Sequence, residues 1–298
     1  MFTQWTRGWA MARASLSVLR KYPTLAVLPL ISGTILVLVV GVILSSLMPQ
    51  FGPLHDLTDG IWRGTDPDTG GKLSFYVGAF GILYALTVVA IFFNVALIDC
   101  ALQFYAGEVP SVRTGLATAL KRLPQILGWG LVAATVGLVL NAIQNVLKDN
   151  LGLLGGLIGG VFEISWSAIT YFVLPVLVSE GAGPITALRR SSAILRNTWG
   201  ESLAGEARFG ILGFFFFLQA AAVFFVGLAV VLSYGATGMA GLGPVLMVLG
   251  VVYGIASFIV LQTLSTIFQA GVYAYASSGR VPASLDPTLV EGAFRSKS

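Results

Sequence analysis

The chain has 298 residues, of which 56% are hydrophobic and only 10% are charged, and its mean hydropathy is +0.87. A soluble domain carries about 25% charged residues, so this composition excludes an ordinary soluble protein and makes the lipid bilayer the expected solvent. The net charge of +4 does not point to nucleic acid, because the basic residues of membrane proteins mainly set orientation and contact anionic head groups.

Metal-binding and catalytic side chains are scarce. The chain holds a single cysteine, Cys100, and a single histidine, His55. A zinc site takes about four Cys or His ligands, so we expect no metal site, and the sequence calls for no cofactor. The same scarcity removes a Ser-His or Cys-His couple from the membrane. We therefore expect that the protein is not an enzyme.

The first predicted element is an amphipathic surface helix at the amino terminus. Its apolar residues step by four and three positions and therefore lie on one helical face. These residues are Trp5, Trp9, Ala12, Leu16 and Leu19. The segment has no short apolar region that ends in a small-residue cleavage site, so it does not resemble a cleaved signal peptide.

Six apolar stretches follow the surface helix, and each is long enough to cross a bilayer. About 20 mostly apolar residues are needed to cross roughly 30 Å of hydrocarbon. The predicted spans are 24–47, 73–101, 125–147, 153–178, 209–234 and 245–275. Pro29 and Pro175 are expected to kink their spans, and neighbouring helices would then satisfy the freed carbonyl groups.

The distribution of Lys and Arg predicts the orientation of the spans. The amino-terminal segment, the second and fourth connections and the carboxy-terminal tail carry nearly all of the basic residues. The opposite side holds only Arg63, Lys72 and Lys148. Because basic residues are retained in the cytoplasm, we expect both termini to be cytoplasmic.

A short motif, Gly followed by two residues and Pro, recurs after each even-numbered span. Its copies are 107–110, 181–184 and 279–282. Glycine can end a helix in the left-handed conformation, and proline suits the first turn of the next helix. The first two copies are expected to lead into short amphipathic helices, in which Arg122 matches Arg196.

The motif predicts an all-α polytopic membrane bundle of six spans, built from three repeated helical hairpins. Each hairpin is preceded by a cytoplasmic amphipathic helix. We treat 1–298 as one membrane domain. Repeat one covers about 1–106, repeat two about 107–180, repeat three about 181–278, and a cytoplasmic tail covers 279–298. Repeats in membrane proteins often place a pathway at their shared axis; a triplicated unit that only builds a stable bundle is the alternative.

Several polar residues fall inside the predicted spans. Glu163 lies about ten residues into span four, roughly 15 Å deep at about 1.5 Å per residue. An acid at this depth is by default a functional residue that faces the bundle interior or a water-filled cavity. Gln219 reaches a similar depth in span five, so a Glu163–Gln219 hydrogen bond is expected. The alternative is that Glu163 only ties two helices together.

Other polar candidates lie in spans two and six. Tyr84 falls near the depth of Glu163, as does Tyr253. Gln262 and Thr266 belong to a polar face in the inner half of span six, which would line a vestibule open to the cytoplasm or make interhelical hydrogen bonds. At the start of span four, five glycines from Gly152 to Gly160 have small-xxx-small spacing, which predicts close packing inside the bundle.

The surface helices carry arginine and lysine on one side and apolar residues on the other. Such helices lie in the membrane interface and attract anionic lipid; clipping the ends of the spans together is the alternative role. The residues expected to face lipid head groups are Arg113, Lys121, Arg122, Arg189, Arg190 and Arg196.

Two stretches resemble a known family. Residues 175–184 (PVLVSEGAGP), continued by 188–191 (LRRS) and 195–201 (LRNTWGE), and residues 122–129 (RLPQILGW) resemble a bacterial family of six-span membrane proteins known only as a domain of unknown function. More distantly, the layout is similar to the membrane domain attached to some glycerophosphodiester phosphodiesterases. The resemblance covers nearly the whole chain and implies a bacterial inner-membrane protein. It supplies no catalytic residues, and we expect neither the catalytic domain nor the activity of those phosphodiesterases.

Two functions follow as hypotheses. In the first, the protein handles a small solute, an ion or a lipid along the repeat axis, with Glu163 involved. In the second, it is a membrane scaffold that binds anionic lipid or partner proteins through its basic surface helices. Membrane lipids are the expected partners, a protein partner or a second copy of the chain stays open, and nucleic acid is not expected.

Overall fold

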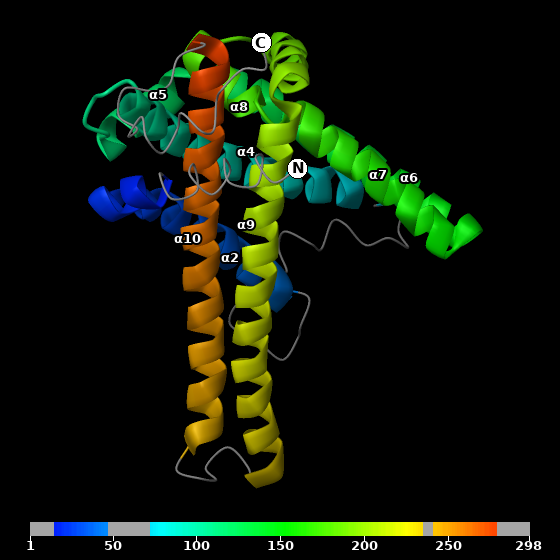
Figure 1. Ribbon diagram of the computed structural model, residues 1–298. Helices are drawn as coiled ribbons and strands as arrows, with labels where there is room; N and C mark the ends of the chain where they lie inside the picture. Colours follow the sequence, from blue (N-terminus) through cyan, green and yellow to red (C-terminus); the bar gives the residue numbers. More distant parts are fainter. Residues whose placement is uncertain (1–14, 47–71, 235–240, 279–298) are drawn as a thin grey trace. The chain divides into compact units, whose positions relative to one another are not determined.

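The computed structural model describes residues 15–46, 72–234 and 241–278, and within these ranges it contains helices and no strand (Figure 1). Residues 15–21 are helical and precede the named elements. Those elements are η1 (Pro23–Ala26), α2 (Val27–Ser46), α4 (Lys72–Tyr105), α5 (Val112–Lys121), α6 (Leu123–Leu151), α7 (Leu153–Thr170), α8 (Val173–Glu180), α9 (Pro184–Tyr234) and α10 (Leu242–Ser278).

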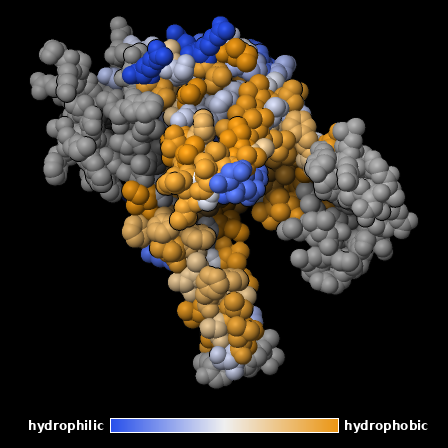
Figure 2. Space-filling view, turned by 90° about the vertical axis from the view of Figure 1, so that its right-hand side faces the viewer, coloured by the Kyte–Doolittle hydropathy of each residue, from blue (hydrophilic) through white to orange (hydrophobic). Residues whose placement is uncertain are grey.

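Six helical segments of the described residues are long and apolar enough to cross a membrane, as the hydropathy of the sequence predicted. They are Pro23–Val42, Val77–Tyr105, Leu123–Leu151, Leu153–Glu180, Phe209–Ser233 and Leu242–Ser278. Each overlaps its predicted span over most of its length. The space-filling view shows predominantly apolar helical surfaces, as a bilayer requires (Figure 2).

The described residues divide into two compact units. One of them, here called the central unit, comprises 27–46, 72–100 and 111–195, and its core draws on α2, α4, α6 and α8. α5 packs across α4 at Gly115, where an added Cβ would lie 2.5 Å from the carbonyl oxygen of Ala96. The largest fully buried side chains of this core are Leu28, Val95, Leu97, Ile98, Ile126, Phe172, Val173 and Leu177.

The other unit, here called the terminal unit, comprises 15–26, 101–110, 196–234 and 241–278. The hydroxyl of Tyr105, at the end of α4, donates a hydrogen bond of 3.2 Å to the carbonyl oxygen of Ile267 in α10. Tyr22 and Phe104 meet edge to face, as do Phe209 and Phe268. Aromatic rings therefore join the amino-terminal residues, α9 and α10 into one core.

The Gly-x-x-Pro motif ends helices as predicted at the two copies that are described. Gly107 has a φ of 86° and Gly181 a φ of 64°, values that favour glycine. Pro184 then begins α9, whereas Pro110 lies just before α5. The third copy, at Gly279, lies outside the described residues, as do Trp5, Trp9 and Ala12. Of the predicted amino-terminal face, Leu19 is buried and Leu16 is half-buried.

The prediction of a separate short helix after Gly181 was wrong. α9 runs without interruption for 51 residues, so the surface segment and the fifth span are one helix. No proline occurs between Pro184 and Pro244, so nothing in this stretch forces the helix to end. The first surface helix, α5, does end at Lys121, and Pro124 follows at the start of α6.

Candidate functional site

The hairpin formed by α6 and α7 is closed by glycines. Gly152, with a φ of 56°, forms the turn. A Cβ at Gly155 would overlap the carbonyl oxygen of Leu147, and a Cβ at Gly159 would lie 2.7 Å from Cγ of Gln144. Both glycines are buried. The predicted close packing is therefore confirmed at Gly155 and Gly159, and it occurs between the two helices of one hairpin.

Glu163 continues the face that these two glycines form on α7, since positions four apart share a face. Its Oε2 atom accepts a hydrogen bond of 3.0 Å from Nε2 of Gln144. The same amide lies 3.5 Å from the carbonyl oxygen of Gly159. The structure thus pairs the half-buried Gln144 with the exposed Glu163 across the hairpin, beside the glycines that bring its helices together.

The environment of Glu163 differs from the expectation in two respects. Its partner is Gln144 rather than Gln219, because these are neighbours across a tight hairpin. The side chain is also exposed rather than enclosed. Among the described residues, no hydrogen bond reaches its second oxygen, Oε1. The carboxyl group is therefore fixed at one oxygen and open at the other.

Aromatic residues tie the first turns of α6 to α7 and to α4. Trp129 of α6 and Trp166 of α7 stack with ring centroids 6.1 Å apart. The hydroxyl of Tyr84 in α4 donates a hydrogen bond of 3.2 Å to the carbonyl oxygen of Leu127. An added Cβ at Gly130 would lie 2.8 Å from Val88, so α4 also approaches α6 closely. Tyr84 thus ties span two to span three instead of contacting Glu163.

The α9–α10 hairpin of the terminal unit holds a second polar pair. The hydroxyl of Tyr253 donates a hydrogen bond of 2.6 Å to Oε1 of Gln219, and both side chains are exposed. Gly250 packs against the backbone of Phe224 and Ala220, where an added Cβ would come within 3.0 Å. Glycine contacts and one side-chain hydrogen bond therefore join these two helices, as they join α6 and α7.

The predicted polar face of span six is closed. Thr263 and Thr266 are buried, and each hydroxyl donates to a carbonyl oxygen of its own helix, Ile259 and Gln262 respectively. Gln262 is half-buried. The hydroxyl groups of these threonines therefore bond within α10. They neither line an open vestibule nor make the interhelical hydrogen bonds that were the alternative.

The basic residues fall into two groups. Arg113 and Lys121 of α5, and Arg189, Arg190 and Arg196 of α9, are exposed as expected. Arg122 is not a free surface cation. It is half-buried, its Nη2 donates a hydrogen bond of 3.3 Å to the carbonyl oxygen of Val178, and its Nε is buried. A cation at the carboxy-terminal end of α8 complements the helix dipole.

Span four is broken between α7 and α8, and a residue of another helix that was not predicted as functional lies at this break. α7 ends at Thr170 and α8 begins at Val173, because Pro175 cannot donate to the carbonyl group four residues earlier. Ser191 of α9 is fully buried here. Its hydroxyl accepts a hydrogen bond of 3.0 Å from the N–H of Phe172 and donates one of 2.6 Å to the carbonyl oxygen of Ile169.

These features define a multi-pass α-helical membrane protein whose hairpins hold polar side chains between apolar spans. The chain belongs to DUF6159, a family of unknown function, whose match covers residues 74–283, from α4 through α10. No curated protein matches the chain. The family relationship confirms the resemblance to an uncharacterised family. The bacterial origin and the similarity to phosphodiesterase membrane domains stay predictions.

Proposed function

We propose that this protein is a non-enzymatic membrane protein that handles a small solute, an ion or a lipid, with the Gln144–Glu163 pair as its polar site within the membrane. The observation that supports this function is the asymmetry of the carboxyl group. Oε2 is fixed by Gln144 at 3.0 Å, whereas Oε1 receives no hydrogen bond from the described residues. A proton or a small cation fits this open oxygen best among the three classes of ligand.

A purely structural role for Glu163 is less consistent with this geometry. An acid inside a membrane is expensive and is usually paired or turned towards a polar environment. An acid that only tied α6 to α7 would be expected to lie buried between them, yet Glu163 is exposed. Gly155 and Gly159 already bring the helices into contact without it. The acid is therefore best explained by a ligand.

The two described hairpins support the repeated architecture on which this hypothesis was built. Gly152 and Gly241 stand at the two turns with φ values of 56° and 75°. Beyond each turn, glycines of the second helix approach the first helix closely, and a glutamine of the first helix shares a hydrogen bond with the second.

We further propose that the protein lies in the bacterial inner membrane with both termini in the cytoplasm, as its basic residues suggest.

Replacement of the acid tests this function. In proteoliposomes, Glu163→Gln should lower proton or cation flux by at least about tenfold, because the amide keeps the shape of the side chain but cannot carry the charge. Flux would be followed with a pH-sensitive or cation-sensitive dye trapped inside the vesicles. Glu108→Gln, at an exposed turn residue, is the matched control and should leave flux unchanged. Normal flux in folded Glu163→Gln would remove this residue from the mechanism.

The exposed basic residues favour a second candidate, a scaffold that binds anionic lipid or a partner protein. Leu120 of α5 is 61% exposed and Ile185 of α9 is 56% exposed. Leu120 directly precedes the exposed cation Lys121. Ile185 lies one helical turn before the exposed cation Arg189. Exposed aliphatic side chains next to exposed cations are typical of segments that lie in the membrane interface.

The scaffold candidate predicts that bound lipid depends on the arginines of α9. The triple replacement of Arg189, Arg190 and Arg196 by Gln should lower the amount of co-purified anionic lipid several-fold, since each basic residue near an anionic surface contributes about 1 kcal/mol. Native mass spectrometry would measure the lipid that remains bound. Lys148→Gln is the control, because it replaces a basic residue in the last turn of α6, outside the arginines of α9. Unchanged lipid and protein partners in the triple variant would rule out this scaffold role.

A further inference from the structure

α8 is a short half-helix that neighbouring helices of the central unit hold at both ends. At its start, the hydroxyl of Ser191 fills the gap in the hydrogen-bond ladder between Ile169 and Phe172. At its end, Arg122 donates to the carbonyl oxygen of Val178, and Gln125 donates to that of Gly181 at 3.4 Å. The position of α8 is therefore set by α9 at one end and by α6 at the other.

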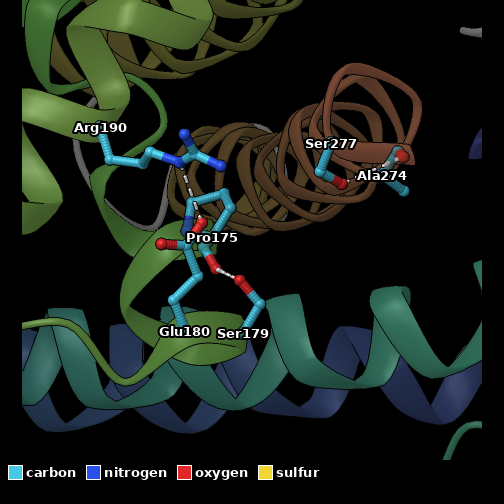
Figure 3. A network of polar contacts seen from close by, with 6 residues as sticks. All are labelled: Pro175, Ser179, Glu180, Arg190, Ala274 and Ser277. Carbon is cyan, nitrogen blue, oxygen red and sulfur yellow. Dashed lines mark hydrogen bonds and ion pairs between the residues drawn. The ribbon is translucent and has the colours of Figure 1, made fainter. Parts of the chain in front are cut away.

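α8 and the first turns of α9 are joined at three points. The turn from Gly181 to Pro184 connects them, Ser191 bonds to the break at the start of α8, and Arg190 reaches Glu180 at 3.3 Å (Figure 3). A displacement of the first turns of α9 must therefore move α8 or break the bonds of Ser191. These bonds tolerate little displacement, because a hydrogen bond weakens steeply once its distance and angle leave a narrow range.

The outer side of the same turns carries charge. Arg189 is exposed, and Arg190 is exposed apart from its ion pair with Glu180. No ion pair of Arg189 occurs within the described part of the chain. These two arginines directly precede Ser191 in the sequence, so a single helical turn presents cations outward and a hydroxyl inward. Phosphate groups of anionic lipids are the complementary charge that a membrane supplies.

We propose that anionic lipid bound at Arg189 and Arg190 controls the break in span four through Ser191. This inference rests on the proposed binding of anionic lipid by the basic surface segments. With lipid bound, the first turns of α9 stay packed against α8 and Ser191 keeps its hydrogen bonds to Phe172 and Ile169. Without lipid, these two hydrogen bonds break more often and the backbone groups at the break lose their partner. A ligand can shift such an equilibrium only by binding one state better than the other. Here the lipid would bind better to the state in which α9 is packed against α8, because that state holds Arg189 and Arg190 side by side.

Amide hydrogen exchange at Phe172 reports this equilibrium directly, because its N–H is bonded to Ser191 rather than to its own helix. The full-length protein would be studied in nanodiscs of phosphatidylcholine alone and of phosphatidylcholine mixed equally with phosphatidylglycerol. We expect exchange at Phe172 to slow by about tenfold in the anionic nanodiscs. Exchange in the α6–α7 hairpin should not depend on the lipid.

Four variants separate the steps of the proposal. Ser191→Ala should exchange fast at Phe172 in both lipids, whereas Ser191→Thr, which keeps the hydroxyl, should retain the lipid dependence. Ser192→Ala is the matched control, because the one hydrogen bond of the Ser192 hydroxyl among the described residues goes to the carbonyl oxygen of Arg189 in its own helix. Replacement of both Arg189 and Arg190 by Gln keeps the Ser191 hydroxyl but should abolish the difference between the two lipids, with exchange at Phe172 in both as fast as in the wild type in phosphatidylcholine alone.

Lipid retention measured in parallel distinguishes two kinds of failure. If the arginine variant retains as much anionic lipid as the wild type, the proposed lipid binding at these residues is wrong. If it loses lipid but wild-type exchange at Phe172 is equal in both nanodiscs, lipid binds without acting on the break and the present inference is overturned. A lipid response that persists in Ser191→Ala also overturns it. A response only to an added acidic protein segment would replace lipid as the partner.

Discussion

Gly155→Ala is expected to open the α6–α7 hairpin and to destabilise the protein. The added Cβ would overlap the carbonyl oxygen of Leu147, and a backbone atom of a helix cannot move aside as a side chain can. Overpacking of this kind costs about 1–3 kcal/mol. The change also separates Gln144 from Glu163, so the hydrogen bond of the candidate site should be lost together with stability.

Gly160→Ala is the matched control for this prediction. It lies on the same helix, and an added Cβ there would meet no atom within 4 Å. Alanine is favoured over glycine in a helix by about 1 kcal/mol, so this variant should be as stable as the wild type or slightly more so. Thermal unfolding in detergent, followed by circular dichroism, compares the two. Equal melting temperatures for both variants would contradict the close contact at Gly155.

Gly181→Ala has the second large expected effect. Its φ of 64° is unfavourable for alanine by about 1–2 kcal/mol. The added Cβ would also collide with the guanidinium group of Arg122. That group would have to leave the carbonyl oxygen of Val178, so α8 should lose its carboxy-terminal cap as well as its turn.

Comparison with Gly183→Ala isolates this effect. Gly183 belongs to the same turn, but its φ is not positive and an added Cβ would meet nothing within 4 Å. Gly181→Ala should therefore melt at a clearly lower temperature than Gly183→Ala. Combining Gly181→Ala with Arg122→Ala should destabilise less than the sum of the two changes, because both disturb one contact. Full additivity would show that Arg122 and Gly181 act independently.

The spans were predictable from sequence because hydropathy and length alone define them. The glycine contacts of α7 were predictable for a similar reason, since small residues spaced four apart form one face. Gly107 and Gly181 end their helices as their motif indicated. In each case, the pattern that carried the information was local in the sequence.

The partner of Glu163 was not predicted correctly, because depth in the membrane does not show which helices are neighbours. A signal was nevertheless present. Gln144 and Glu163 lie at comparable distances on either side of Gly152, and residues so placed meet in an antiparallel hairpin. A tight turn at Gly152 would have had to be assumed, and only the structure shows the φ that makes it.

The role of Ser191 could not be predicted from the sequence. Pro175 predicted that backbone groups of span four would need outside partners, and this expectation is confirmed. The hydroxyl that supplies them comes from another helix, and its position depends on how α9 leaves the turn at Gly181. The same limitation explains Arg122, which looked like any other surface cation but lies against the end of α8.

Proton and cation flux in proteoliposomes should be compared for the wild type, Gln144→Leu, Glu163→Gln and the double variant. We expect flux in the wild type above that of empty vesicles. We also expect a loss of at least about tenfold in Glu163→Gln, with no further loss in the double variant, because the two residues form one site. Flux that is absent from the wild type, or unchanged in a folded Glu163→Gln variant, would show that the Gln144–Glu163 pair is not a site of proton or cation transport.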